Sequence, residues 1–168
     1  MITEFVFLIF FSFSLFGYTF LCKKIFHILI YDKSKFKINN LDILFGYFLV
    51  ITLLLITHFF IPIKNISLII IIFGIFFFIQ SLFKKKIYQI NFVYYSLILF
   101  LLIYINSSNS PLYDTQLYHH QIINWNYNFK IANNLALVDG RLGMISPWQL
   151  LLSIGNFKFL DVKLSYLI

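Results

Sequence analysis

Two charged side chains in a mostly apolar sequence are the first candidates for chemistry. Asp114 carries a carboxylate, which suits a general base or a ligand for a divalent cation. Arg141 is the only arginine among the thirteen basic residues. Because lysine supplies the positive charge everywhere else, this arginine indicates a contact that a point charge cannot make, such as a bidentate bond to a carboxylate or phosphate. The two residues predict a site for an anionic ligand.

Simpler structural roles exist for each of these residues. Asp114 can cap the first turn of a helix with its carboxylate, and Arg141 can form a loop salt bridge with Asp139. His119 and His120 are adjacent, so on a helix they point about 100° apart and cannot easily share one metal ion. A metal site on Asp114 therefore needs ligands from elsewhere in the chain.

A helical pattern begins near Asp114 and gathers further candidate residues. One apolar face repeats at Tyr118, Ile122, Trp125 and Phe129, the spacing of an amphipathic helix. Tyr118 and Gln121 follow Asp114 by four and seven residues, so all three can face one groove. The candidate catalytic residue and metal ligand is Asp114, and the candidate substrate-binding residues are Tyr118, His119, His120, Gln121, Trp125 and Arg141.

The composition places these residues on a membrane protein. Hydrophobic residues make up 61% of the 168 residues and charged residues 11%, which is far from the balance of a soluble domain. Apolar runs at 5–22, 43–61, 66–83 and 90–105 approach the length that crosses a hydrocarbon core of about 30 Å. The sequence predicts an all-α integral membrane protein with four transmembrane helices in residues 1–106. The lipid bilayer is its expected partner.

Lysine placement predicts the orientation of these helices. Eight of the thirteen basic residues lie in the first and third connections between apolar runs, and one lies in the second. The positive-inside rule puts the lysine-rich connections in the cytoplasm. We therefore expect a multi-pass protein of the bacterial inner membrane, with its N-terminus and residues 107–163 on the periplasmic side. Lysines that flank apolar runs are topology signals, so nucleic-acid binding is not expected.

Residues 107–163 form the expected periplasmic loop. The amphipathic helix would lie at the outer membrane surface, where its aromatic residues suit the headgroup level. Residues 147–154 are apolar but too short to span, which indicates a re-entrant or interfacial segment. Residues 164–168 read as the start of a further transmembrane helix, so the chain is expected to be the N-terminal part of a longer protein.

Residues 113–153 resemble a family of mostly uncharacterised bacterial polytopic membrane proteins. The shared pattern is YDTxLYHxQ followed by a tryptophan and an RLG turn, here YDTQLYHHQIINW and DGRLGMISPWQLLLS. Asp139-Gly140 stands where a histidine is usual, and residues 144–147 replace an FNSS-like run. That family is similar to the GT-C glycosyltransferases, which take sugar from a polyprenyl-phosphate carrier. The resemblance implies that Asp114 acts as the base or metal ligand beside the acceptor.

The sequence thus leads to two hypotheses. The first is a GT-C-like glycosyltransferase that uses a polyprenyl-phosphate-linked sugar in cell-envelope glycan assembly, with a divalent cation as the cofactor to consider. The alternative is a non-enzymatic membrane protein, either a glycan-export or accessory component or a truncated remnant. The predicted spans contain no lysine, arginine, aspartate or glutamate between their ends, which argues against an ion-coupled transporter.

Overall fold

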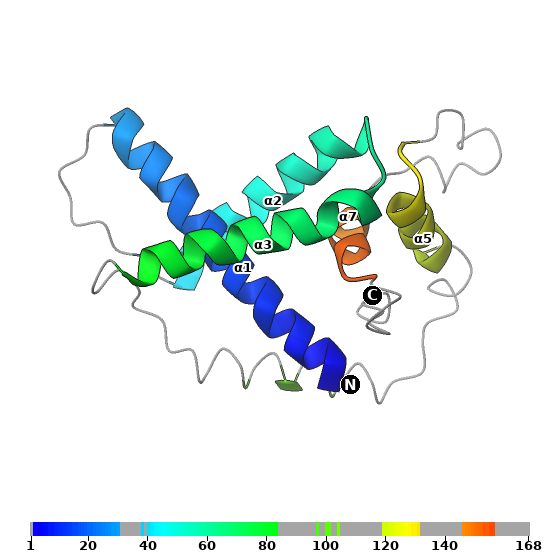
Figure 1. Ribbon diagram of the computed structural model, residues 1–168, viewed down its shortest axis with the longest axis horizontal. Helices are drawn as coiled ribbons and strands as arrows, with labels where there is room; N and C mark the ends of the chain where they lie inside the picture. The colour runs from blue at the N-terminus through cyan, green and yellow to red at the C-terminus, as the bar shows by residue number, and fades with distance from the viewer. Residues whose placement is uncertain are drawn as a thin grey trace.

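Helices form all of the named elements of the computed structural model, as the apolar composition predicts (Figure 1). The structure describes residues 2–30, 38, 40–83, 97, 100, 101, 104, 119–131 and 146–156. In chain order the elements are α1 (Ile2–Ile30), a short 3-10 helix η1 (Asn40–Asp42), α2 (Ile43–His58), α3 (Ile63–Leu82), α5 (His120–Asn128) and α7 (Pro147–Ile154).

Helix α1 is longer than the first apolar run of the sequence. It continues through two lysines to Ile30, so its 29 residues extend about 43 Å. The side chain of Lys23 pairs with Asp42 of η1, which compensates one of the two positive charges on the helix. The segment after residue 22, where the sequence predicts a lysine-rich connection between spans, is helical as far as Ile30.

The prediction of four transmembrane helices is wrong. Within the described residues, two helical segments are long and apolar enough to cross a membrane, Phe5–Phe26 of α1 and Ile63–Leu82. The predicted second span ends early: α2 has 16 residues, about 24 Å, which is shorter than a hydrocarbon core of about 30 Å. The remaining residues of that apolar run form the turn that leads to Pro62 and α3. The predicted fourth span lies outside the described residues except for 97, 100, 101 and 104.

Small residues let α1 cross α2 and α3 at close range (Figure 1). A Cβ atom on Gly17 of α1 would overlap the carbonyl oxygen of Gly74 in α3. One on Gly74 would overlap the hydroxyl of Ser14, and one on Gly46 of α2 would overlap the carbonyl oxygen of Leu15. Small residues at helix crossings of this kind are typical of membrane proteins, where close backbone contact replaces the hydrophobic effect as the driving force for association.

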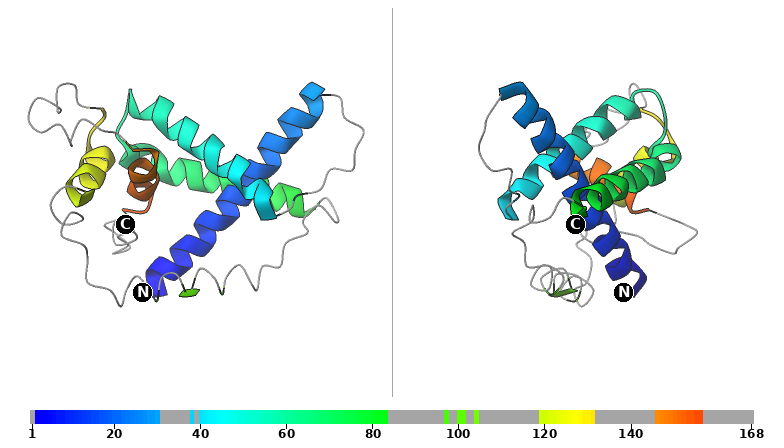
Figure 2. Two further views of the ribbon diagram at one scale, coloured as in Figure 1. Left: turned by 180° about the vertical axis from the view of Figure 1, so that it is seen from behind. Right: turned by 60° about the vertical axis from the view of Figure 1, so that its left-hand side comes forward.

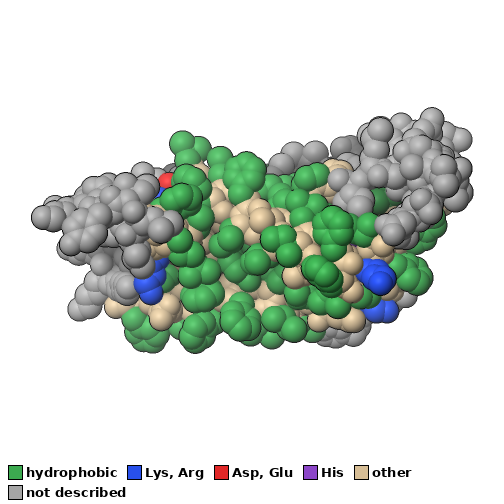
Figure 3. All heavy atoms as spheres, turned by 90° about the horizontal axis from the view of Figure 1, so that it is seen from above, with side chains coloured by type: hydrophobic (Ala, Val, Ile, Leu, Met, Phe, Trp, Pro, Cys, Tyr) green, Lys and Arg blue, Asp and Glu red, His purple; other side chains and the backbone are tan. Residues whose placement is uncertain are grey.

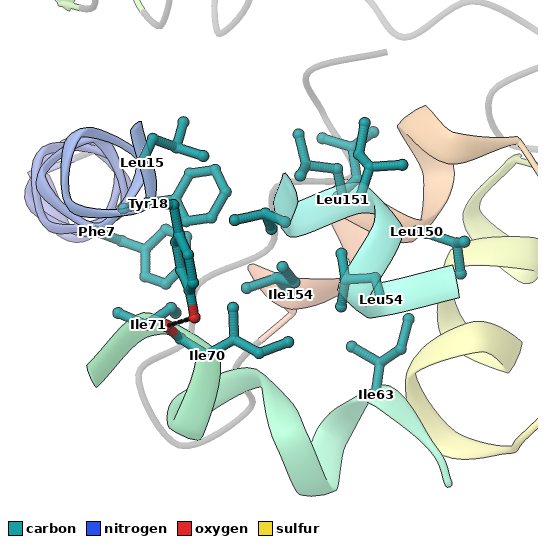
Figure 4. Packing of buried hydrophobic residues seen from close by; sticks show 14 of the residues in the cluster. Phe7, Leu15, Tyr18, Leu54, Ile63, Ile70, Ile71, Leu150, Leu151 and Ile154 are labelled. Carbon is teal, nitrogen blue, oxygen red and sulfur yellow. Dashed lines mark hydrogen bonds between the residues drawn. The ribbon is translucent and has the colours of Figure 1, made fainter. Parts of the chain in front are cut away.

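An apolar core joins α1, α2, α3 and α7 and includes Ile123 of α5 (Figure 4). The leucines and isoleucine of α7 lie against Leu54 of α2 and Ile63 of α3, and the same core includes Tyr18 from the middle of α1. Helix α7 is therefore buried by protein, which satisfies the condition for a short apolar segment that does not span. The buried members of this core are Phe7, Phe11, Leu15, Tyr18, Val50, Ile51, Leu54, Ile63, Ile70, Ile71, Ile123, Leu150, Leu151, Leu152 and Ile154.

The outer surface between the ends of the helices is apolar (Figure 3). Described lysines appear only at the two ends of the view, and hydrophobic side chains cover the region between them. Exposed apolar patches this large mark an interaction with lipid or protein. The exposed apolar residues of α3 are Leu68, Ile69, Ile72, Phe73, Phe76, Ile79 and Leu82.

Helices α5 and α7 pack together where α2 and α3 are joined (Figure 2). Both contact α3, and α7 also contacts α2. This places the two short helices at the end of α3 opposite Phe83, after which the sequence continues with three lysines.

Candidate functional site

The pair formed by α5 and α7 contains most of the hydrogen-bonded polar side chains outside the long helices. Helix α7 begins at a Ser-Pro pair: Ser146 occupies the N-cap position and Pro147 the first turn, where its missing N–H costs nothing. Gln149 completes a capping box, and its side-chain oxygen accepts a hydrogen bond from the Ser146 backbone N–H at 3.3 Å. The start of α7 is therefore fixed by Ser146, which precedes the helix, and by Pro147 and Gln149 of its own first turn.

The same glutamine connects α7 to His119, the residue before α5. The Gln149 side-chain nitrogen lies 2.9 Å from Nδ1 of His119. A backbone N–H can only donate, so the Gln149 atom that faces the Ser146 N–H must be the side-chain oxygen. The side-chain NH₂ of Gln149 then faces His119. His119 Nδ1 is therefore the acceptor, and the neutral ring carries its proton on Nε2. Gln149 is buried, so this orientation is sterically held.

Two further bonds join α5 to α7. The hydroxyl of Ser153 lies 2.7 Å from the carbonyl oxygen of Gln149 and 3.2 Å from that of Ile123 in α5. The side-chain amide of Asn156 donates to the side-chain oxygen of Asn124 at 2.8 Å. These contacts connect residues 30 to 32 positions apart in the sequence. The bonds of Gln149 and Ser153 hold the two halves of the 113–153 pattern together.

A buried histidine lies where α2 ends. His58 is 1% exposed and Asn126 of α5 is 7% exposed. The backbone oxygen of His58 accepts a bond from the N–H of Ile131 at 3.1 Å, so the segment after α5 is tied to the end of α2. Burial lowers the pKa of His58 below its ordinary value, and a side-chain hydrogen bond to Asn126 partly opposes this shift by raising the pKa.

The predicted site residues are only partly within the described residues. Asp114, Tyr118 and Arg141 lie outside them, as do the residues between α5 and Ser146 apart from 129–131. His119 and His120 are half-buried, Gln121 is exposed and Trp125 is half-buried. The structure brings His119 to Gln149, and it leaves Gln121 on the surface.

The buried face of α5 differs from the predicted face. Ile122 is buried as expected, but Phe129 is 61% exposed and follows the end of the helix. Ile123 and Asn126 are buried instead. The helix packs on α7 and α3 with this face, so its orientation is set by protein contacts rather than by a membrane surface alone.

Sequence reasoning missed Gln149, Ser153, Asn126 and Asn156. One signal was available, because Ser146 and Gln149 have the spacing of a capping box and Pro147 follows the cap. The other side chains look like ordinary polar residues, and nothing in their spacing distinguishes them.

The described polar residues at α5 and α7 offer hydrogen bonds without formal charge. They are amides, imidazoles and a hydroxyl, which suit neutral polar groups such as sugar hydroxyls. In this part of the chain, no group of three His, Cys, Asp or Glu residues is arranged to hold a metal ion. A divalent cation would therefore need Asp114 and donors outside the described residues.

A family model, described as a domain of unknown function (DUF8201), matches residues 1–167. The chain belongs to this family. No curated protein and no solved structure shows significant similarity to it. Because the match covers both the long helices and the α5–α7 pair, the DUF8201 domain includes the whole described structure.

Proposed function

We propose that this DUF8201 chain is the N-terminal part of a GT-C-like glycosyltransferase that uses a polyprenyl-phosphate-linked sugar in cell-envelope glycan assembly. The observation that supports the proposal best is the hydrogen bond between His119 and Gln149, at 2.9 Å. It joins the YDTxLYHxQ half of the pattern to the segment after the RLG turn. A transferase needs both halves at one place, because the base lies in the first half and the phosphate ligand in the second.

The proposed roles follow from the chemistry of each side chain. Asp114 removes the proton from the acceptor hydroxyl or holds a divalent cation near the sugar phosphate. Arg141 binds the phosphate through its two-pronged guanidinium. His119 is held by Gln149 and presents an Nε2–H donor when its ring is neutral. Tyr118, His120, Gln121 and Trp125 complete the sugar-binding surface along α5 and the residues before it.

The proposed location is the bacterial inner membrane, with the N-terminus and residues 107–163 on the periplasmic side. Two helices long and apolar enough to cross a membrane support membrane association. The position of α5 and α7 supports the orientation, because these helices lie at the end of α3 far from Phe83 and the three lysines that follow it.

The test is transfer of sugar from a polyprenyl-phosphate donor, measured with membranes that contain the chain and any continuation encoded after Ile168. Asp114→Asn should reduce the turnover at least 100-fold, the usual loss for a general base or an electrostatic group of this kind. Asp161→Asn, which lies beyond the matched pattern, is the control and should keep the activity within about two-fold of wild type.

Arg141→Lys separates phosphate recognition from catalysis. Because a lysine keeps the charge but loses bidentate geometry, the KM for the donor should rise about tenfold or more with a smaller change in kcat.

Full activity in Asp114→Asn contradicts the assignment of the base. Membranes without transfer activity, combined with loss of a surface glycan on deletion of the gene, would favour an accessory or export role.

A further inference from the structure

Three exposed aromatic side chains lie where α2 ends. Phe59 and Phe60 follow this helix and are 62% and 75% exposed, and Phe129, which follows α5, is 61% exposed. The backbone N–H of Ile131 donates to the carbonyl oxygen of His58 at 3.1 Å, so the end of α5 is tied to the end of α2. This bond brings the three aromatic residues, here called the aromatic rim, to the same end of the molecule.

Two exposed lysines accompany the aromatic rim. Lys130 directly follows its member at α5, and Lys64 lies in the first turn of α3, just after the turn that carries its other two members. Neither the turn 59–62 nor α5 contains an acidic residue, whereas at the other end of α2 the carboxylate of Asp42 compensates the charge of Lys23. The rim therefore combines exposed rings with positive charge, and lysines lie at this end of the surface in Figure 3.

Aromatic rings beside lysines match one kind of partner. At a bilayer surface, lysine ammonium groups bind lipid phosphates while aromatic rings enter the boundary between headgroups and acyl chains. A soluble anion would leave the rings in water, and an uncharged apolar partner would bury the ammonium groups without a counter-charge. We propose that the aromatic rim, Lys64 and Lys130 dock on a membrane surface of anionic phospholipid. Each lysine binds its own lipid phosphate, so no fixed distance between the two ammonium groups is required.

The length of α3 is consistent with a rim at the depth of the headgroups. The 20 residues of this helix extend about 30 Å, equal to the thickness of a hydrocarbon core. If α3 crosses the bilayer, Lys64 in its first turn lies at the edge of that core, where a lysine side chain reaches the phosphates. The bond between Ile131 and His58 holds the end of α5 near the same depth. Lipid binding here goes beyond the proposed function, because it requires neither Asp114 nor sugar transfer.

Photo-cross-linking from the rim reads the lipid contact at this end of the molecule alone. Phe129→p-benzoylphenylalanine places a photoreactive ring at a position that is already exposed, so the fold should not change. The chain is reconstituted in nanodiscs that contain equal amounts of dioleoyl phosphatidylglycerol and dioleoyl phosphatidylcholine, and the masses of the adducts identify the lipid. Because the acyl chains are identical, the ratio of the two adducts reports the headgroup. We expect phosphatidylglycerol adducts to exceed phosphatidylcholine adducts about fivefold or more, the effect of one lysine near an anionic surface.

Matched lysine variants test the source of this preference. Lys64→Gln combined with Lys130→Gln should bring the adduct ratio close to one. Lys24→Gln removes the same charge from α1, beside Lys23 and its partner Asp42 at the start of α2. The 16 residues of α2 separate that position from the rim by about 24 Å, far more than the screening length of about 8 Å at physiological salt. The control variant should therefore keep the wild-type ratio.

Three results would overturn the lipid surface. Equal adducts with the two lipids exclude recognition of the anionic headgroup, and an absence of lipid adducts excludes contact with the bilayer. Cross-links to a second copy of the chain identify the rim as a protein interface instead. A chain that lacks sugar-transfer activity but keeps the lipid preference would contradict the proposed function and leave the lipid surface intact.

Discussion

At the scale of single residues, the hydroxyl groups of the long helices show how an apolar chain buries polar atoms. Thr19 donates to the carbonyl oxygen of Leu15 at 2.9 Å, and Thr57 donates to that of Leu53 at 2.7 Å, each four residues earlier in the same helix. Tyr18 instead donates to the carbonyl oxygen of Ile70 in α3 at 2.9 Å (Figure 4). Only this last bond connects two helices, so it adds specificity to the α1–α3 crossing.

The buried imidazole of His58 predicts an acid-sensitive fold. Its folded-state pKa is lowered by burial from 6.5, so the unfolded state binds more protons as the pH falls. The free energy of unfolding should be unaffected by this residue above pH 6.5 and should fall progressively below it. Chemical unfolding of wild type and His58→Gln between pH 8 and pH 4.5 isolates the effect, because all other groups are shared. Parallel pH profiles for the two proteins would contradict the prediction.

The residue scale also shows where sequence reading stopped. The pattern around Asp114 and His119 predicted a candidate site in this stretch, and the structure brings one of its members, His119, to a helix 30 residues further on. It did not indicate Gln149 or Asn126, because amide side chains acquire their roles from the packing of α5 on α7. Such tertiary pairing leaves no periodic trace in the sequence.

At the scale of elements, helix existence could be predicted and helix length could not. The apolar run 43–61 is as long as a membrane span, yet α2 ends at His58. Pro62 restricts the backbone of the residue before it, Ile61, to extended or turn conformations, so Ile61 cannot continue the helix. A hydropathy pattern counts apolar residues whether they lie in the helix or in the turn after it, so it overestimates the length of α2. The same limit explains α1, which continues past lysines that the pattern treated as the start of a loop.

The α1–α3 crossing predicts a strict size limit at one position. Gly17→Ala adds one carbon where the Gly74 carbonyl already lies, so the helices must separate and lose packing. We expect the free energy of unfolding to fall by about 1–3 kcal/mol, measured by denaturant unfolding in detergent micelles. Val6→Ile also adds one carbon to α1, but on its exposed side, and should change stability by less than about 0.5 kcal/mol. Equal effects of the two substitutions would show that the crossing is not tight.

At the scale of the whole molecule, composition alone indicated a protein with an apolar outer surface. The structure shows this surface on the described helices, with lysines at both ends (Figure 3). The number of spans could not be obtained in this way, because it depends on where each helix stops. The same exposed surface would also suit burial by a protein partner, since core helices of large soluble assemblies have similar length and composition.

Accessibility of the two ends of α3 decides between these environments. The 20 residues of α3 extend about 30 Å, equal to the thickness of a hydrocarbon core. Phe60 and Phe83 flank the helix and are 75% and 84% exposed, so cysteines at these positions should be reachable wherever water is present. In a Cys22→Ser background, we expect an impermeant maleimide applied to intact spheroplasts to label Phe60→Cys and not Phe83→Cys. Inverted vesicles should give the opposite result, because the lysines after Phe83 favour the cytoplasm.

Each possible labelling pattern has a distinct physical meaning. Labelling of both cysteines from the same side means that α3 does not cross the bilayer, and its apolar face must then be covered by protein. If Phe83→Cys is labelled from outside and Phe60→Cys from inside, α3 still crosses the membrane, but α5 and α7 lie on the cytoplasmic side. That outcome would remove the proposed periplasmic site from contact with an outward-facing polyprenyl-phosphate sugar. The expected pattern keeps the α5–α7 pair, the Asp114 stretch and the outer leaflet on the same side of the membrane.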